Sequence, residues 1–257
     1  MPLVAVLLAL VAVAFFTLPL IGLLRRVPWS DLWDTLREPA ARDAIRLSIE
    51  CSLWSTFFSL LFGVPLAYVL ARARFPGRSL VRALVVLPMV VPPVVGGVAL
   101  LYAFQRNNGL VGGLIYDLFD FQFTFSKWGV ILAETFVAMP FLVITVEAGL
   151  RSIDRRYEDA ASSLGAGRWT VFRRITLPMI APALIAGAAL AWARALGEFG
   201  ATITFAGNIQ GRTQTTPLAV YLLLESDPSV AIGLSIVLLA VCVAVLAFLR
   251  DRWLGVG

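Results

Sequence analysis

The chain has 257 residues, of which 60% are hydrophobic and 14% are charged. A soluble domain contains about 45–50% apolar and about 25% charged residues, so this composition excludes an ordinary soluble domain. It predicts an all-α membrane protein that forms one domain over residues 1–257. The net charge of +5 is carried almost entirely by arginine, which favours cytoplasmic loops over nucleic-acid binding because no basic patch is interleaved with aromatic residues.

Six apolar segments are long enough to cross the roughly 30 Å hydrocarbon layer of a membrane. They are predicted at about 3–24, 44–71, 80–104, 128–150, 179–205 and 229–249. The second segment contains Gly63 and Pro65 and should be kinked. A short surface helix is expected within 25–43, a loop at 107–126, and a short interfacial helix at 217–225 that Thr216 caps.

The third segment has a proline- and glycine-rich centre, Leu87-Pro-Met-Val-Val-Pro-Pro-Val-Val-Gly-Gly. Proline removes a backbone donor, so helical hydrogen bonding should break there. Such a break at membrane depth is tolerated where it is buried in protein or lines a cavity. Pro92 and Pro93 are therefore candidates for a translocation path or gate, and a simple kink is the alternative.

Two ionisable residues of opposite charge lie within the fifth segment. Arg194 and Glu198 are four residues apart, so on a helix they share a face and can pair. Charged residues in a membrane usually face protein or water, so this pair either lines a path or forms a structural ion pair. Glu134 and Glu147 of the fourth segment are alternative partners for Arg194. The polar side chains that accompany the pair as path candidates are Thr202, Thr204 and Asn208.

The distribution of basic residues predicts the orientation in the membrane. With both termini in the cytoplasm, the inner segments hold 12 of the 21 basic residues and the outer segments hold 8. The bias agrees with the positive-inside rule. The outer segment 25–46, which holds five arginines, is the exception.

The longest polar interval runs from Asp154 to Pro178. Asp154 should cap a short helix, and Gly165 should end that helix in the left-handed conformation. A hinge at Gly165–Gly167 should lead to a second short helix through Arg174, and Pro178 should open the next span. The interval therefore predicts a polar docking element between two spans.

This interval resembles the cytoplasmic coupling loop, here about 151–178, of permease subunits of ATP-binding-cassette (ABC) importers. The family pattern is Glu-Ala-Ala, three residues, Gly, nine residues, Ile, one residue, Leu-Pro. The matching positions are Asp159, Ala160, Ala161, Gly165, Ile175, Leu177 and Pro178, with Asp in place of Glu. The resemblance implies that these residues, together with Tyr157, Glu158 and Leu164, couple the chain to an ATPase.

A second resemblance, to molybdate permeases, rests on residues 194–208 and 211–221. It implies a type I importer fold in a bacterial or archaeal plasma membrane and a homodimer around a central path. Two ATPase subunits that bind ATP and Mg should sit on the cytoplasmic side, and an oxyanion-binding protein should deliver the substrate outside. Tungstate and sulfate or thiosulfate remain alternative substrates.

Two other classes of protein are less consistent with the sequence. An enzyme is disfavoured because the chain has no histidine, and Cys51 and Cys242 suggest neither a disulfide framework nor a metal site. No phosphate-binding Gly-x-x-x-x-Gly-Lys-Ser/Thr motif occurs, so we expect ATP on a separate chain and no cofactor or metal on this one. An ATP-independent channel or secondary transporter is the remaining alternative, although inverted repeats are not evident.

Overall fold

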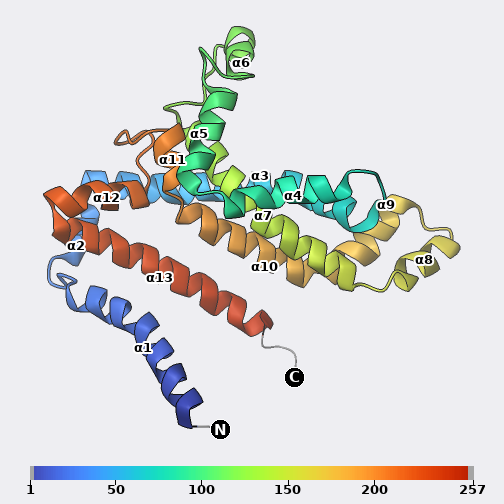
Figure 1. Cartoon of the computed structure of the whole chain (residues 1–257), viewed down its shortest axis with the longest axis horizontal. Coiled ribbons are helices and arrows are strands. Elements are labelled where there is room, and N and C mark those ends of the chain that lie inside the picture. Colours follow the sequence, from blue (N-terminus) through green and yellow to red (C-terminus); the bar gives the residue numbers. More distant parts are fainter. Residues whose placement is uncertain (1–2, 254–257) are drawn as a thin grey trace.

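The computed structural model describes residues 3–253, and this part of the chain consists of helices and connecting loops (Figure 1). In chain order the elements are α1 (Leu3–Arg25), α2 (Leu32–Arg37), α3 (Pro39–Arg72), α4 (Arg78–Val90), α5 (Pro93–Phe104), α6 (Gly112–Phe119), α7 (Lys127–Ser152), α8 (Arg156–Ser163), α9 (Arg168–Val171), the π-helical turn η1 (Phe172–Thr176), α10 (Leu177–Leu196), α11 (Gly200–Phe205), α12 (Thr216–Ser226) and α13 (Pro228–Trp253).

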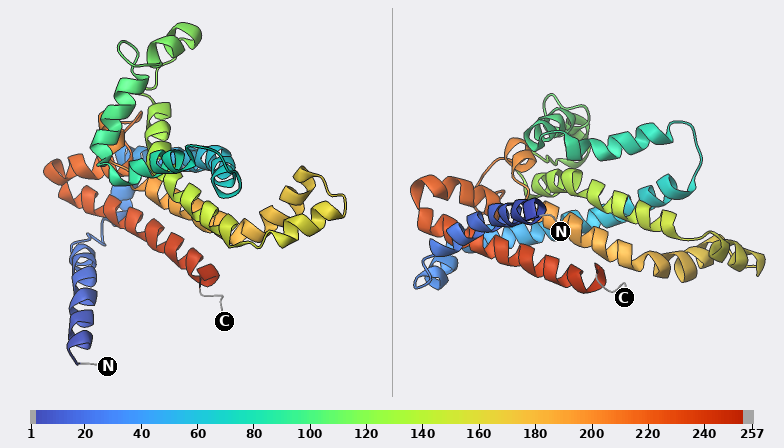
Figure 2. Two further views of the ribbon diagram at one scale, coloured as in Figure 1. Left: turned by 45° about the vertical axis from the view of Figure 1, so that its right-hand side comes forward. Right: turned by 60° about the horizontal axis from the view of Figure 1, so that its bottom comes forward.

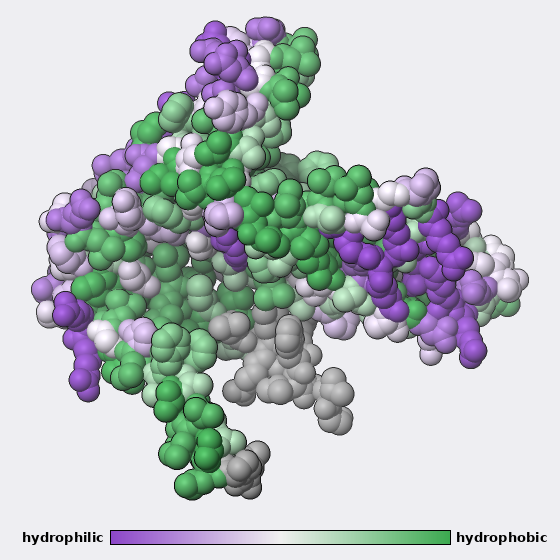
Figure 3. All heavy atoms as spheres, in the orientation of Figure 1, coloured by the Kyte–Doolittle hydropathy of each residue, from purple (hydrophilic) through white to green (hydrophobic). Residues whose placement is uncertain are grey.

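Five stretches of helix are long and apolar enough to cross a membrane, and the bent pair α4–α5 raises the number to six. The prediction of about six spans in an all-α protein is therefore confirmed. The apolar surface of the molecule agrees with this, since hydrophobic residues cover its middle and hydrophilic ones gather over α8 and α9 at one end (Figure 3).

The centre of the molecule is α7, which packs between α3 and α10. Two thirds of its span (67%) is buried, against 28% or less for the other long spans. A helix that is apolar around its whole circumference is expected to be buried in this way. Close approach of α3 depends on Gly63, because a Cβ there would lie 2.9 Å from a methyl carbon of Leu142. Helix α3 stays continuous through Pro65.

Helix α1 differs from the other spans because none of its residues is buried. It stands away from the bundle in Figure 1 and in the left view of Figure 2. Its sequence is apolar on every side, so its surroundings in the membrane must be lipid or another protein chain.

The third span is broken as the sequence predicts. Helices α4 and α5 meet at an angle of 120°, with Val91 and Pro92 between them. Pro93 is the first residue of α5, where the missing backbone N–H costs little. Helix α5 leads outward to α6, so the prediction that 107–126 is a loop was wrong in part (Figure 2). The helix forms because the apolar residues after Gly112–Gly113 favour a helix more than the two glycines disfavour it.

The predicted fifth span, 179–205, was wrong at both ends. Helix α10 is continuous with α9 and η1, so one helix runs from Arg168 to Leu196. Pro178 is the second residue of α10, directly after η1, and does not begin a separate span. Proline is tolerated there because the π turn already alters the pattern of backbone hydrogen bonds. The chain then turns at Gly197–Phe199 before the separate helix α11.

Three smaller boundaries also differ from the predictions. Helix α3 begins at Pro39 instead of 44, because proline suits the first turn of a helix. Helix α13 continues to Trp253, past the predicted end at 249, because arginine is a good helix former. The short helix predicted at 217–225 exists as α12, but Thr216 does not cap it; its backbone N–H donates to Ser48 Oγ at 2.7 Å.

Candidate coupling site and translocation path

Helices α8 and α9 form a projecting element at the end of the bundle farthest from α2 and α12 (Figure 1). The connection between them depends on Gly165, whose φ of +84° lies in the left-handed region and confirms the predicted helix end. The Asp154 carboxylate accepts a hydrogen bond of 3.0 Å from the backbone N–H of Arg156, the first residue of α8, while the N-cap position itself is occupied by Arg155. The element is thus a short helix on a glycine hinge.

The outer surface of this element carries large apolar side chains in a polar setting. Tyr157, Leu164 and Trp169 are 58%, 90% and 71% exposed. Ala160 is exposed beside them, and its small side chain lets another surface approach the helix backbone. Exposed apolar groups surrounded by polar ones mark an interaction site. The second half of the motif lies farther back on the continuous helix, with Ile175 and Leu177 half-buried and Pro178 exposed.

The two adjacent acidic residues of α8 point in different directions. Asp159 is exposed. Glu158 is turned toward the bundle, where its Oε1 accepts from Arg72 Nη2 at 2.9 Å and from Thr176 Oγ1 at 2.8 Å. The sequence predicted a coupling role for Glu158 but gave no indication of Arg72 or Thr176, because the three residues are far apart along the chain.

The predicted pair within the membrane exists, but its geometry differs from the prediction. Arg194 Nη2 lies 2.5 Å from Glu198 Oε2, and the contact has the geometry of an ion pair without hydrogen-bond angles. Glu198 lies beyond the end of α10, and its other oxygen accepts from the Ala201 backbone N–H at 2.8 Å. The carboxylate is 1% exposed and the guanidinium side chain is 27% exposed. Glu198 therefore holds the turn together while Arg194 keeps partial access to its surroundings.

The two alternative partners proposed for Arg194 have other surroundings. Glu147 forms ion pairs with Arg82 of α4 and Arg151 of α7, so it ties α4, the first half of the broken span, to the central helix. Glu134 is 1% exposed, and its Oε2 has no hydrogen-bond partner among the residues that the structure describes. Neither glutamate pairs with Arg194.

The broken span and α11 pack closely together. A Cβ on Gly97 would lie 2.7 Å from Thr204 Cβ, and one on Gly200 would lie 2.9 Å from Pro93 Cβ. The structure thus brings Pro93 and Thr204 into one helix contact, with Pro92 in the adjacent break. Thr202 is 0% exposed on the inner side of α11. Asn208 is half-buried after α11, where its amide nitrogen donates to the Leu218 carbonyl at 3.4 Å.

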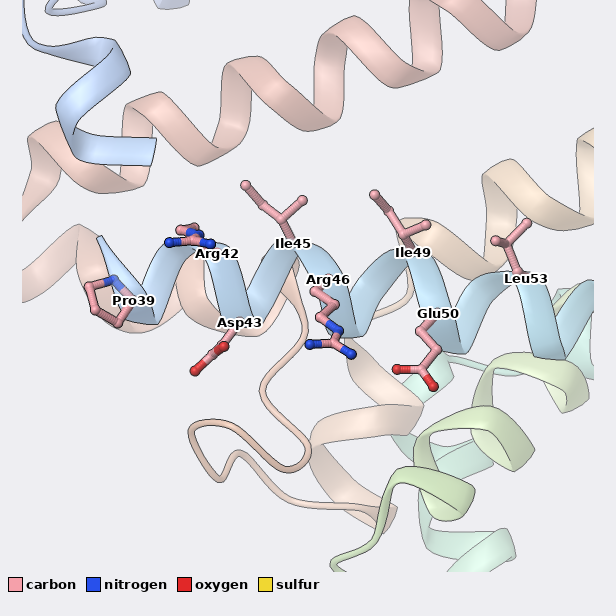
Figure 4. Close-up of a pocket in the computed structure, with 8 residues that line it drawn as sticks. All are labelled: Pro39, Arg42, Asp43, Ile45, Arg46, Ile49, Glu50 and Leu53. Carbon is pink, nitrogen blue, oxygen red and sulfur yellow. The ribbon is translucent and has the colours of Figure 1, made fainter. Parts of the chain in front are cut away.

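The N-terminal part of α3 lines a hollow of about 850 Å³ that the sequence did not predict. Arg46 and Glu50 point to one side of the helix, while Ile45, Ile49 and Leu53 point to the other (Figure 4). Glu50 pairs with Lys127 Nζ at 2.6 Å. Two of the five arginines that depart from the positive-inside rule, Arg42 and Arg46, line this hollow. Within residues 3–253, no cluster of three acidic, cysteine or histidine side chains could hold a metal ion.

These features define a multi-pass membrane protein with a projecting two-helix loop at one end and a broken span near its centre. The profile of the family described as "Binding-protein-dependent transport system inner membrane component" matches residues 63–256. The match covers most of the chain, and the chain belongs to this family.

Two curated relatives and one solved structure illustrate the similarity. The chain is 43% identical over 249 residues to the "Molybdenum transport system permease protein ModB" of Mycobacterium tuberculosis (strain ATCC 25618 / H37Rv), which covers 97% of this chain and 91% of that protein. It is 41% identical over 147 residues to the "Sulfate transport system permease protein CysT" of Escherichia coli (strain K12), which covers 57% of this chain and 52% of that protein.

The solved structure is that of a bacterial ABC transporter involved in the import of the acidic polysaccharide alginate. Its TM-score is 0.78 at 22% identity, and the likeness covers 98% of this chain and 96% of that chain. At this identity the likeness concerns the fold alone, and it confirms the ABC permease fold that the sequence predicts.

Proposed function

We propose that this chain is the permease subunit of an ATP-driven importer for molybdate. Molybdate is supported as the substrate by the 43% identity to a molybdenum permease, which extends over nearly the whole chain. The similarity to the sulfate permease extends over 57% of the chain. Tungstate and sulfate are tetrahedral dianions like molybdate, so they are the alternative substrates. The permease needs only to offer a path that a dianion tolerates, and selectivity then resides mainly in the binding protein.

The functional unit in this proposal is a homodimer in the plasma membrane of a bacterium or archaeon. Two copies enclose the central path, and α1, which has no buried residue in its own chain, supplies apolar surface for a neighbour. Both termini lie in the cytoplasm, as the distribution of arginines favours. A separate oxyanion-binding protein delivers the substrate from the outside.

Helix α8 is the coupling helix in this proposal. The exposed apolar groups on and beside it are Tyr157 of α8, Leu164 directly after α8, and Trp169 of α9, and they suit insertion into a cleft of an ATPase subunit on the cytoplasmic side. ATP and Mg bind to that subunit, and this chain carries no catalytic residue. When the ATPase pair closes, α8 moves with it, and the spans attached to α8 switch the path between inward and outward access.

The path itself is proposed to lie beside the break in the third span. Pro92 and Pro93 allow α5 to turn away from α4, and the contact between α5 and α11 lies next to this break. Arg194 is charged and keeps partial access to its surroundings, so it is the candidate contact for a passing dianion. Glu198, Thr202, Thr204 and Asn208 shape the surrounding wall.

Retention of the ATPase by this chain tests the coupling proposal. Leu164→Ser removes an apolar group that is 90% exposed, and Leu110→Ser is a matched control because Leu110 is 89% exposed in the loop between α5 and α6, away from α8 (Figure 1). Burial of one leucine contributes about 1.5–3 kcal/mol, so co-purification of the ATPase should weaken about tenfold or more in the first variant alone. Equal ATPase retention in both variants would contradict the assignment of α8. Molybdate uptake without any ATPase would favour a channel or secondary transporter.

A further inference from the structure

The Glu158 side chain joins three segments that are far apart in the sequence. Its Oε1 accepts from Arg72 Nη2, at the end of α3, and from Thr176 Oγ1, in the π-helical turn. The site is sheltered, because the Arg72 and Glu158 side chains are 12% and 16% exposed and Thr176 is 1% exposed. One carboxylate oxygen therefore connects α8 to the cytoplasmic ends of two membrane spans.

This connection is the principal polar link between α8 and the bundle. Among the hydrogen bonds of the described residues, Glu158 is the one α8 side chain that bonds to another helix, since Ser162 and Ser163 bond to carbonyls of their own helix. Both connections of α8 to the bundle lack regular structure, and one of them turns at Gly165. Without the Glu158 link, an eight-residue helix on such connections would be free to pivot.

The segments that carry the two partners of Glu158, α3 and η1, also contact each other through aromatic side chains. Tyr68 of α3 meets Phe172 of η1 edge to face, with ring centroids 5.6 Å apart. Trp169 stacks on Phe172 at 5.7 Å. Single π-helical turns are found frequently at functional sites, where they interrupt an otherwise regular helix. The π turn here marks the point at which the coupling element passes into α10.

We propose that Glu158 is a positioning residue that transmits the movement of α8 to α3 and α10. The inference rests on the proposed coupling role of α8 and adds the contact through which movement of α8 reaches the membrane spans. A charge-assisted hydrogen bond from Arg72 and a hydrogen bond from the Thr176 hydroxyl both end on Glu158 Oε1. They fix α8 to both spans at one atom, so the two spans must move together with α8. The adjacent Asp159, which is exposed, is left for the partner subunit. Two neighbouring acids thus have separate roles, one inward and one outward.

The number of molybdate ions transported per ATP hydrolysed tests this inference in the complex of permease, ATPase and binding protein reconstituted in vesicles. Glu158→Gln removes the charge, and Thr176→Val removes the hydroxyl while keeping the shape of the side chain. Loss of one charge-assisted hydrogen bond should lower the ratio about tenfold in Glu158→Gln, with a smaller fall in Thr176→Val. Glu50→Gln is the control, because it makes the same chemical change in an ion pair with Lys127 at the opposite end of the molecule.

The ratio separates transmission from folding, because loss of folded protein lowers uptake and hydrolysis together. As a second test, the charge-swapped double variant Arg72→Glu with Glu158→Arg should regain at least half of the wild-type ratio, while each single reversal loses it. An unchanged ratio in Glu158→Gln, or no recovery in the double variant, would overturn the inference. Failure of the proposed function would look different, since the wild-type complex would then show no ATP-driven uptake at all.

Discussion

Replacement of Gly165 by valine isolates the backbone geometry of the coupling loop from its contacts. Gly165 has a φ of +84°, and a Cβ built on it would meet no atom within 4 Å. Any effect of valine in the isolated chain therefore comes from the left-handed backbone and not from a clash. The same substitution at Gly167 provides the control, because that residue has a φ of −65° and equally open surroundings.

The size of the effect follows from the cost of the left-handed conformation. A residue with a Cβ pays roughly 1–2 kcal/mol there, and a β-branched side chain such as valine is at the upper end. This cost corresponds to a shift of about 5- to 30-fold against the native loop. The short helix α8 would respond by ending differently and changing its angle to α9, while the membrane spans keep their packing.

Paired assays of uptake and ATP hydrolysis in reconstituted complexes measure this effect. For Gly165→Val we expect normal amounts in the membrane, continued ATP hydrolysis and molybdate uptake reduced several-fold. Gly165→Asn should behave nearly as wild type, because asparagine tolerates the left-handed region. Gly167→Val should also retain uptake. Unchanged uptake and unchanged stimulation of hydrolysis by the binding protein in Gly165→Val would refute the assignment of the loop.

Three further predictions concern the bundle and its outer end. Glu198→Gln should destabilise the purified protein by about 3–5 kcal/mol, seen as a lower melting temperature, because it leaves Arg194 without its counter-charge; an unchanged melting temperature would show that the pair is not structural. Gly97→Val should cost about 1–3 kcal/mol in the same assay, because its Cβ would lie 2.8 Å from the Ala201 carbonyl oxygen; full stability would contradict the close packing of α5 on α11. The pKa of Asp227 is lowered by hydrogen bonds from the Ser229 hydroxyl and from backbone N–H groups, so its contribution to stability should be present above the usual pKa of about 4 and lost as the pH falls through the lowered value. Wild type and Asp227→Asn should therefore differ in melting temperature at neutral pH and converge in acid, and a constant difference would contradict this.

Local rules predicted the features of the fold that depend on single residues. Pro92 and Pro93 lack backbone donors, so the break in the third span could be placed from the sequence. Gly165 follows a short polar helix, and its left-handed conformation confirms the helix end that was predicted there. Hydropathy and length were sufficient to predict how many spans there are and roughly where they lie, although not the ends of the fifth span.

Features that depend on distant contacts could not be predicted. The inward orientation of Glu158 is set by Arg72, which is 86 residues away in the sequence. Gly197 and Glu198 follow Leu196, but apolar residues resume at Phe199, so the average hydropathy of 179–205 did not reveal the end of α10. Helical spacing correctly indicated that Arg194 and Glu198 pair, but it could not show that Glu198 lies in the turn after the helix.

The most direct test of the account is uptake of labelled molybdate by vesicles that contain this chain with its ATPase and binding protein. Unlabelled tungstate and sulfate serve as competitors. We predict uptake that requires ATP and that is suppressed by tungstate but not by excess sulfate. Suppression by sulfate would reassign the substrate while leaving the permease assignment intact. Molybdate uptake in the absence of any ATPase would contradict the coupling role of residues 154–178 and with it the central claim.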